Sequence, residues 1–157
     1  MPDGKRILFG GESAGRLRSY ILDINGGNLR PSLLLRKAWL RRWFRQIAGW
    51  DPDLGIKLYS ITGGEARSIP GLDPGFAPAQ WSADGSALYV YRNGEMPLQV
   101  YRVNLATGKQ QMVREITPAD RTGVVFVGPI AMSLDASRYV YSYYHNLSVL
   151  YIISGLK

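Results

Sequence analysis

Short runs of apolar residues, separated by polar turns, extend along most of the chain. Residues 88–91 and 100–105 are continuous or alternating runs of β-branched and aromatic residues, and both have the length of a strand. Asp84-Gly85 precedes the first run and Thr107-Gly108 follows the second, and glycine accepts the positive φ that such tight turns require. The pattern over residues 78–109 therefore predicts a strand, a tight turn, a strand, a loop, a strand and a closing turn.

This order of elements recurs along the chain. Tyrosines mark matching positions of the copies and are separated by 39, 42 and 50 residues: Tyr20, Tyr59, Tyr101 and Tyr151. A period of roughly 40 residues with several strands in each unit is typical of propeller blades. A single four-stranded blade cannot bury both of its faces, so blades must stack on their neighbours. The sequence therefore predicts an all-β fold, a partial β-propeller of about four blades of antiparallel strands.

The expected blades cover residues 1–31, 32–70, 71–118 and 119–157. In the last blade, residues 129–141 repeat the strand, turn and second strand, and residues 149–153 are expected to form the next strand. The longer final interval is assigned to residues 117–128, which we expect to form a surface loop. Blades without ring closure leave open strand edges and uncovered faces, so the isolated chain is expected to self-associate or to be poorly soluble.

The residues at the turns resemble the TolB-like β-propeller repeats, the WD-like repeats of many bacterial proteins. The resemblance covers the chain outside residues 32–45 and rests on Pro2-Asp3-Gly4-Lys5, Tyr20, Asp23, Gly26-Gly27 and residues 81–85, which are Trp-Ser-Ala-Asp-Gly. At the last hairpin turn the chain has Leu134-Asp135-Ala136, where these repeats usually carry Pro-Asp-Gly. Family members close rings of roughly six to eight blades, so the resemblance implies that this chain is part of a longer protein.

Residues 147–157 resemble the end of large bacterial proteins that join an N-terminal serine/threonine kinase domain to a C-terminal propeller. This resemblance implies a C-terminal fragment whose missing blades belong to a longer parent chain. It also implies a non-catalytic sensor or scaffold module that binds a protein or a small ligand through the propeller loops. A membrane-tethered parent with its propeller outside the cytoplasm is implied as well, and a cytoplasmic location stays open. None of the kinase motifs is present in this sequence.

The formal net charge of +7 comes almost entirely from one segment. Residues 30–45 contain six basic residues and no acid, so the rest of the chain carries a formal charge of +1. This distribution does not indicate a nucleic-acid-binding domain. The chain has no Cys, which excludes disulfides, thiol nucleophiles and zinc–thiolate sites. No apolar run reaches the roughly 18 residues of a membrane span.

Residues 32–45 do not fit the blade pattern. Apolar residues at 35, 39, 40, 43 and 44 recur at helical spacing with basic residues between them, which is typical of a cationic amphipathic helix. Such a helix would bind an anionic membrane or a nucleic acid. The alternative is a translated frameshift, because permitted codons for residues 35–39 and 42–45 encode repeat-like sequence when both are shifted by the same single base. Both interpretations stay open, and both predict a disrupted strand in the second blade.

One short motif has catalytic potential. Residues 11–15, Gly-Glu-Ser-Ala-Gly, match the nucleophile elbow, in which Ser13 would serve a serine hydrolase or a peptidase-associated propeller. The elbow requires a helix after the serine, whereas residues 16–24 predict a strand. His145 is the one histidine available as a base, and its place between two expected strands is typical of an exposed hairpin residue. A glycine-rich loop between two strands is therefore the favoured interpretation of the motif.

The remaining candidates predict structure rather than chemistry. The isolated acids in expected loops lack the spacing of metal ligands: Asp51, Asp53 and Asp120. The aromatic residues expected to pack between blades are Trp81, Tyr89 and Tyr91. The sequence thus predicts no catalytic, cofactor-binding or metal-binding residue and no cofactor. It predicts a non-enzymatic binding module, with a hydrolase that uses Ser13 as the alternative.

Overall fold

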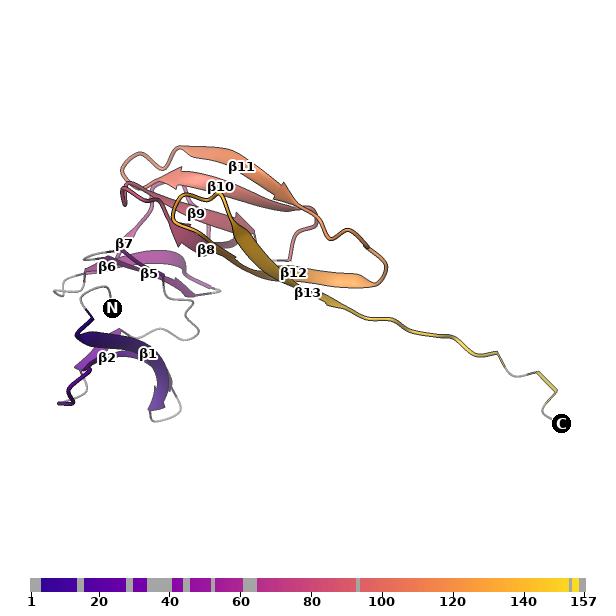
Figure 1. Cartoon of the computed structure of the whole chain (residues 1–157), viewed down its shortest axis with the longest axis horizontal. Coiled ribbons are helices and arrows are strands. Elements are labelled where there is room, and N and C mark those ends of the chain that lie inside the picture. Colours follow the sequence, from indigo (N-terminus) through magenta and orange to yellow (C-terminus); the bar gives the residue numbers. More distant parts are fainter. Residues whose placement is uncertain are drawn as a thin grey trace.

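The computed structural model of the chain consists of β-strands joined by turns and loops (Figure 1). It describes residues 4–13, 16–27, 30–33, 41–43, 46–51, 53–60, 65–92, 94–152 and 154–155. Every helix or strand assigned within these ranges is a strand, and all neighbouring strands are antiparallel. The predicted all-β fold is confirmed.

The strands form four sheets in chain order. The first sheet contains β1 (Arg6–Ser13), β2 (Arg16–Asp23) and β3 (Arg30–Leu33). The second contains β4 (Arg41–Trp43), β5 (Gln46–Asp51), β6 (Gly55–Ser60) and β7 (Arg67–Ser68). The third contains β8 (Phe76–Trp81), β9 (Ala87–Arg92), β10 (Leu98–Asn104) and β11 (Gln110–Ile116). The fourth contains β12 (Val124–Met132) and β13 (Tyr139–His145).

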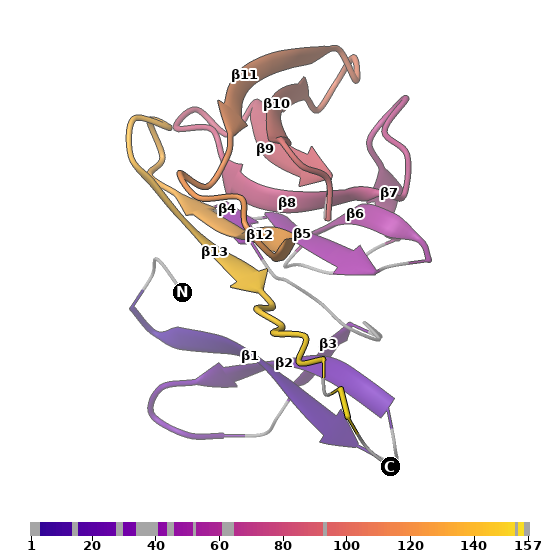
Figure 2. The ribbon, with the colours of Figure 1, turned by 90° about the vertical axis from the view of Figure 1, so that its right-hand side faces the viewer.

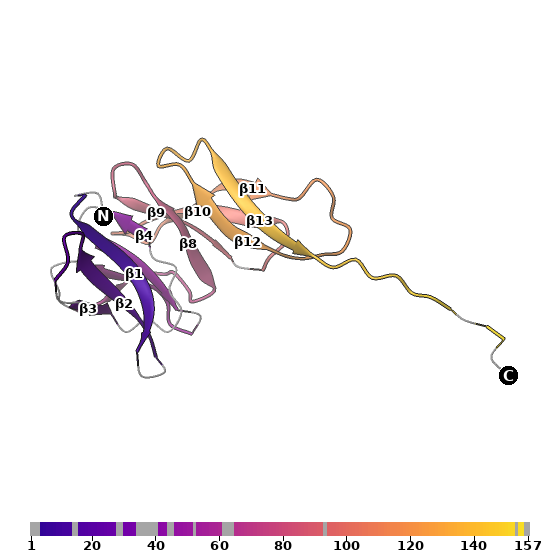
Figure 3. The same cartoon turned by 60° about the horizontal axis from the view of Figure 1, so that its bottom comes forward.

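Each sheet is a simple meander, because strands that are neighbours in the sheet are consecutive in the sequence. Figure 1 and Figure 2 show the second sheet between the first and the third. Figure 3 shows the sheets following one another from the N-terminal hairpin to β13. This arrangement of successive antiparallel meanders is that of a partial β-propeller.

The third sheet is buried on both faces over β8, β9 and β10, while β11 is largely exposed. Side chains alternate between the two faces along a strand. On β9, Leu88 and Val90 enter a core shared with the second sheet, which includes Leu58 of β6. Tyr91, the next residue along, enters a second core that includes Ile130 of β12. Burial on both faces is the physical reason that this sheet needs a neighbour on each side.

A β-bulge on β8 places a tryptophan in the first of these cores. The register between β8 and β9 shifts between Pro78 and Gln80. Ala79 packs in the second core, and Trp81 packs in the first, although residues two apart share a face in a regular strand. Trp81 is 0% exposed. The expected packing between sheets is confirmed for all three aromatic residues, which are Trp81, Tyr89 and Tyr91.

Two hairpin turns, one after β8 and one after β12, have the same backbone geometry. In the first, the Gly85 N–H donates to the Ser82 carbonyl oxygen at 2.9 Å, and in the second the Ala136 N–H donates to the Ser133 carbonyl oxygen at 2.9 Å. Gly85 has a φ of 70° and Ala136 a φ of 56°. Alanine thus takes the left-handed conformation that glycine usually supplies. The sequence departure at residues 134–136 therefore leaves the turn intact.

Part of the unusual segment 32–45 is strand rather than helix. β4 pairs antiparallel with β5, from Arg41 opposite Ala48 to Trp43 opposite Gln46. This pairing satisfies backbone hydrogen-bonding groups within the second sheet. The helical alternative therefore does not hold for residues 41–43, and the frameshift interpretation stays a prediction. Residues 34–40 and 44–45 lie outside the described residues.

The expected strand after β13 is not formed. β13 ends at His145, and the Asn146 N–H donates to the Gly123 carbonyl oxygen at 2.8 Å in the loop before β12. Beyond this contact the chain leaves the body of the molecule, as Figure 1 and Figure 3 show. Leu150 and Ile152 are 86% and 87% exposed. The prediction of a strand at residues 149–152 was wrong, because the bond from Asn146 to Gly123 keeps the chain in line with β13. Ile153, the last residue of the predicted strand, lies outside the described residues.

Candidate functional site

Aromatic side chains form a row along one face of β13. Residues two apart on a strand point to the same face. The successive ring centroids are 6.3, 6.2 and 5.8 Å apart. We name this row the aromatic ladder, and its members are Tyr139, Tyr141, Tyr143 and His145.

The aromatic ladder is anchored at one end and exposed at the other. Tyr139 and Tyr141 pack against the core between the third and fourth sheets. The guanidinium carbon of Arg114 on β11 lies 4.7 Å from the centroid of the Tyr139 ring, which is a cation–π contact. Tyr143, in contrast, is 47% exposed. The Tyr143 ring is thus accessible to solvent, while Tyr139 and Tyr141 of the same ladder are held by packing.

Asp120 lies in the loop before β12, and Gly123 of the same loop accepts the Asn146 N–H next to the exposed end of the aromatic ladder. The Thr122 N–H donates to Asp120 Oδ1 at 2.8 Å. This bond, together with one from the Thr122 side chain, holds the pKa of Asp120 below its ordinary value, and His145 contributes a smaller attraction. The carboxylate is therefore charged over a wider pH range than usual.

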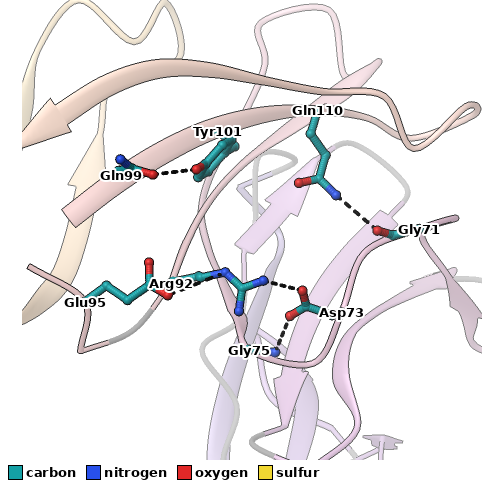
Figure 4. A network of polar contacts seen from close by, with 8 residues as sticks. All are labelled: Gly71, Asp73, Gly75, Arg92, Glu95, Gln99, Tyr101 and Gln110. Atoms are coloured by element: carbon teal, nitrogen blue, oxygen red, sulfur yellow. Dashed lines mark hydrogen bonds and ion pairs between the residues drawn. The ribbon is translucent and has the colours of Figure 1, made fainter. Parts of the chain in front are cut away.

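A second polar cluster joins the linker between β7 and β8 to β9 (Figure 4). The Arg92 guanidinium forms an ion pair with the Asp73 carboxylate, whose Oδ1 accepts the Gly75 N–H at 2.9 Å. Arg92 Nε lies 3.6 Å from Glu95 Oε1, and the guanidinium carbon lies 4.5 Å from the centroid of the Phe76 ring. Two carboxylates and an aromatic face therefore engage this cation. Arg92 holds the linker to β9 and is a poor candidate for binding an external anion.

The same linker is bonded to β11, and the first residue of β8 packs against β10. Gln110 Nε2 donates to the Gly71 carbonyl oxygen at 3.0 Å (Figure 4). The Tyr101 ring meets the Phe76 ring edge to face at a centroid distance of 5.6 Å, and its hydroxyl donates to Gln99 Oε1 at 2.6 Å. These contacts fix the junction of the second and third sheets. The cluster is therefore structural, and it leaves the aromatic ladder as the stronger candidate for recognition.

The turn after β8 is built around an aspartate. Asp84 Oδ1 accepts the Ser82 hydroxyl at 2.6 Å and the Ser86 N–H at 3.1 Å, and Oδ2 accepts the Ser86 hydroxyl at 2.7 Å. These bonds hold the pKa of Asp84 well below its usual range, the bond from Ser82 most strongly. The carboxylate is engaged within its own turn, so Asp84 has a structural role.

The turn after β12 repeats this arrangement. Asp135 accepts the Ser133 hydroxyl at 2.5 Å, the Ser137 N–H at 3.1 Å and the Ser137 hydroxyl at 2.8 Å. The bonds from the two serines lower the pKa of Asp135 to about 2. Because the same three donors recur in both turns, the aspartates belong to the repeat rather than to a ligand site.

The two residues of the alternative hydrolase lie on different sheets. Ser13 ends β1 and is paired with Arg16, the first residue of β2, while Ala14 and Gly15 lie outside the described residues. An antiparallel strand therefore follows the serine in place of the helix that a nucleophile elbow requires. His145 ends β13 and belongs to the aromatic ladder. The geometry gives the hydrolase alternative no support.

The predicted isolated acids do not assemble into a site. Asp51 pairs with Gly55 across the tip of the β5–β6 hairpin, and Asp120 lies in the loop before β12. Across the described part of the chain, no three His, Cys, Asp or Glu side chains come together in a way that could hold a metal ion. In the same residues, no helix has the length and apolar character needed to cross a bilayer.

Sequence reasoning missed both the aromatic ladder and the Arg92 cluster. The ladder had a signal, because tyrosine occurs at every second position from 139 to 143 and strand periodicity puts such residues on one face. The cluster had none, since Asp73 and Arg92 are 19 residues apart and meet only where the linker passes β9. Long-range pairs of this kind depend on the fold rather than on local spacing.

Comparison with known proteins supports the fold. No protein-family model matches the chain, and no curated protein matches it. The structure is similar to the crystal structure of TolB from Acinetobacter baumannii, with a TM-score of 0.66 at 14% sequence identity. The match covers 89% of this chain and 35% of that one, so the chain spans about a third of the length of TolB. Together with the four antiparallel sheets, this similarity establishes a TolB-like fold, a partial β-propeller.

Proposed function

We propose that this chain is a non-catalytic β-propeller module that binds a protein through the exposed end of the aromatic ladder. The observation that carries the proposal is the position of Tyr143, which is 47% exposed while its ladder neighbour Tyr141 is packed against a core. Tyrosine is enriched at the centres of protein interfaces, because its rigid ring buries a large area at low entropic cost. A small ligand that stacks on the same ring is the alternative occupant.

The charge beside the ladder indicates the chemistry of the partner. Asp120 is a carboxylate at neutral pH, and it lies in the loop that is bonded to Asn146, the residue after His145. Such a carboxylate favours a cationic group, which also attracts the faces of tyrosine rings. The partner segment that fits this surface carries a Lys or Arg next to an apolar residue.

We also propose that the module serves a larger bacterial signalling protein, such as a serine/threonine kinase, as its sensor or scaffold part. The resemblance of residues 147–157 to kinase-linked propellers supports this assignment. The described first and fourth sheets contain three and two strands, so further strands of a parent chain could complete them. In this proposal the blades are residues 1–31, 32–70, 71–118 and 119–157, and the propeller lies outside the cytoplasm.

Selection of peptides against the whole chain tests the binding proposal. A random peptide library is panned on the immobilised protein, and the enriched peptides are synthesised and titrated calorimetrically. We expect enrichment of basic–apolar peptides and a loss of affinity on the order of tenfold in Tyr143→Ala, because a buried tyrosine contact is typically worth more than 1 kcal/mol. Val125→Ala is the matched control, since Val125 is 61% exposed on the neighbouring strand β12. No enrichment, or peptides that bind Tyr143→Ala equally well, would contradict the proposal.

A serine-reactive fluorophosphonate probe tests the hydrolase alternative separately. We expect the full chain to remain unlabelled, because Ser13 lies at the end of a strand paired with β2 and not in a nucleophile elbow. An adduct on Ser13 that disappears in Ser13→Ala would overturn the non-catalytic assignment. Peptide binding at Tyr143 would be unaffected by this result.

A further inference from the structure

Among the described sheets, β13 is the edge strand (bordering strand) with the least protection against pairing with another chain. Bordering strands of natural sheets usually carry charged residues or proline, which discourage pairing with another chain. The other described bordering strands follow this rule, with Arg6 in β1, Pro31 in β3, Arg41 in β4, Arg67 in β7, Pro78 in β8, Arg114 in β11 and Pro129 in β12. β13 contains no proline and no Asp, Glu, Lys or Arg. It pairs with β12 on one side, and its other edge has no partner strand among the described residues.

The uncharged character continues past the end of β13. Residues 139–152 contain no Asp, Glu, Lys or Arg. Within residues 147–152 the apolar side chains are strongly exposed, from 66% at Leu147 to 87% at Ile152. High β-propensity, apolar character and absence of charge are the features that favour strand addition.

Asn146 directs this segment away from its own sheet. Its N–H donates to the Gly123 carbonyl oxygen at 2.8 Å. A Cβ built on Gly123 would lie 2.3 Å from the Asn146 carbonyl oxygen and 3.3 Å from Leu147 Cδ2, so the two backbones are in close contact. The segment therefore leaves in line with β13 rather than turning back along its open edge, as Figure 1 shows.

We propose that a second copy of this chain occupies the open edge of β13. In an antiparallel, two-fold arrangement, residues 146–152 of each copy pair with β13 of the other. Because the segment is uncharged, two copies meet without like-charge repulsion, and both bury apolar side chains that are exposed in the single chain. The register is centred between His145 and Asn146, so Val140 of one copy lies opposite Tyr151 of the other.

Cross-linking of single-cysteine variants tests this register. The chain contains no Cys, so every cross-link formed by a thiol reagent must involve an introduced cysteine. Val140→Cys and Tyr151→Cys are mixed in equal amounts and treated with a short bis-maleimide, and a cross-linked dimer is expected that neither variant gives alone. Both side chains are exposed, at 69% and 82%, so the substitutions leave the fold intact. Leu54→Cys replaces Val140→Cys in the control mixture and should give no cross-link, because Leu54 is 65% exposed in the turn between β5 and β6.

Two further measurements separate the other occupants of this edge. In the double variant Val140→Cys/Tyr151→Cys, a cross-link within a single chain would show that the segment folds back on its own β13, and would overturn the proposal. A monomer at all concentrations in sedimentation equilibrium would overturn it as well. Leu150→Lys/Ile152→Lys should weaken dimerisation on the order of tenfold, since charges at a strand edge oppose pairing. Unchanged dimerisation in this variant would place the interface elsewhere and contradict the proposal.

Discussion

Gly108 lies directly against the carbonyl oxygen of Pro70. A Cβ built on Gly108 would be 1.9 Å from that oxygen, and Gly108 has a φ of 72°. The contact joins the turn between β10 and β11 to the linker that leaves the second sheet. Backbone therefore packs on backbone at this junction, which leaves no room for a side chain at Gly108.

Replacing Gly108 with alanine should destabilise the fold by more than the cost of a left-handed alanine alone. Gly108→Ala combines the cost of a left-handed alanine with displacement of the Pro70 backbone, and we expect a loss of about 2–4 kcal/mol in the free energy of unfolding. Gly71→Ala is the matched control, because Gly71 has a φ of 63° and its Cβ would meet nothing within 4 Å. The control should lose about 1–2 kcal/mol. Equal losses in urea denaturation would show that the contact does not constrain the junction.

The two matching hairpin turns should respond oppositely to exchange of glycine and alanine. Ala136 holds a φ of 56°, so Ala136→Gly relieves backbone strain and should raise the free energy of unfolding by about 0.5–1 kcal/mol. Gly85 holds a φ of 70°, so Gly85→Ala should lower it by about 1–2 kcal/mol. Thermal denaturation of both variants measures the two shifts. A loss of stability in Ala136→Gly would contradict the left-handed conformation of this turn.

Stability should fall in acid through the aspartates of these turns. The pKa of Asp135 is lowered to about 2 by the bonds from Ser133 and Ser137, and that of Asp84 is lowered as well. A carboxylate with a lowered folded-state pKa contributes stability above its unfolded pKa of about 4, and this contribution is lost as the pH falls through the folded value. The stability difference between wild type and Asp135→Asn should therefore narrow as the pH falls from about 4 towards 2. A difference that stays constant over this range would contradict the assigned hydrogen bonds.

The tryptophan buried by the β8 bulge should be among the most costly side chains to remove. Trp81 is 0% exposed between the second and third sheets, so Trp81→Ala should cost about 3–5 kcal/mol through lost burial and the cavity that remains. Leu54→Ala is the control for an exposed apolar residue, at 65% exposure, and should change stability by less than about 0.5 kcal/mol. The denaturant midpoints of both variants measure these changes in the free energy of unfolding, provided that the denaturant dependence (m-value) is the same as in the wild type. A small effect in Trp81→Ala would contradict the packing of these sheets.

Local signals were sufficient to predict most of the third sheet. Asp84-Gly85 and Thr107-Gly108 marked its turns, and the apolar residues of β9 and β10 marked its strands, because turn chemistry and strand periodicity are both local. Tyr89 and Tyr91 were expected to pack between blades, and the structure places both against the core shared with the fourth sheet. The recurrence of this pattern then predicted the stacked sheets.

The sequence could not show contacts that depend on how the chain closes on itself. Arg41–Trp43 carries a helical pattern, yet these residues form β4, because pairing with β5 outweighs local propensity. The expected strand at residues 149–152 followed from the repeat, but the contact between Gly123 and Asn146 directs the chain elsewhere. The aromatic ladder was visible as alternating tyrosines, while its partial exposure depended on how the third sheet covers Tyr139 and Tyr141.

Amide hydrogen exchange of the full chain tests the central claim, that the third sheet is sheltered by a neighbour on each face. β9 and β10 are paired on both edges and buried on both faces, so their amides should exchange most slowly. Ile130→Ala, which opens the core shared with β12, should speed exchange in β9 and β10 as well as in β12. Exchange in β9 and β10 that is as fast as in β1, or that does not respond to this substitution, would contradict the stacked arrangement.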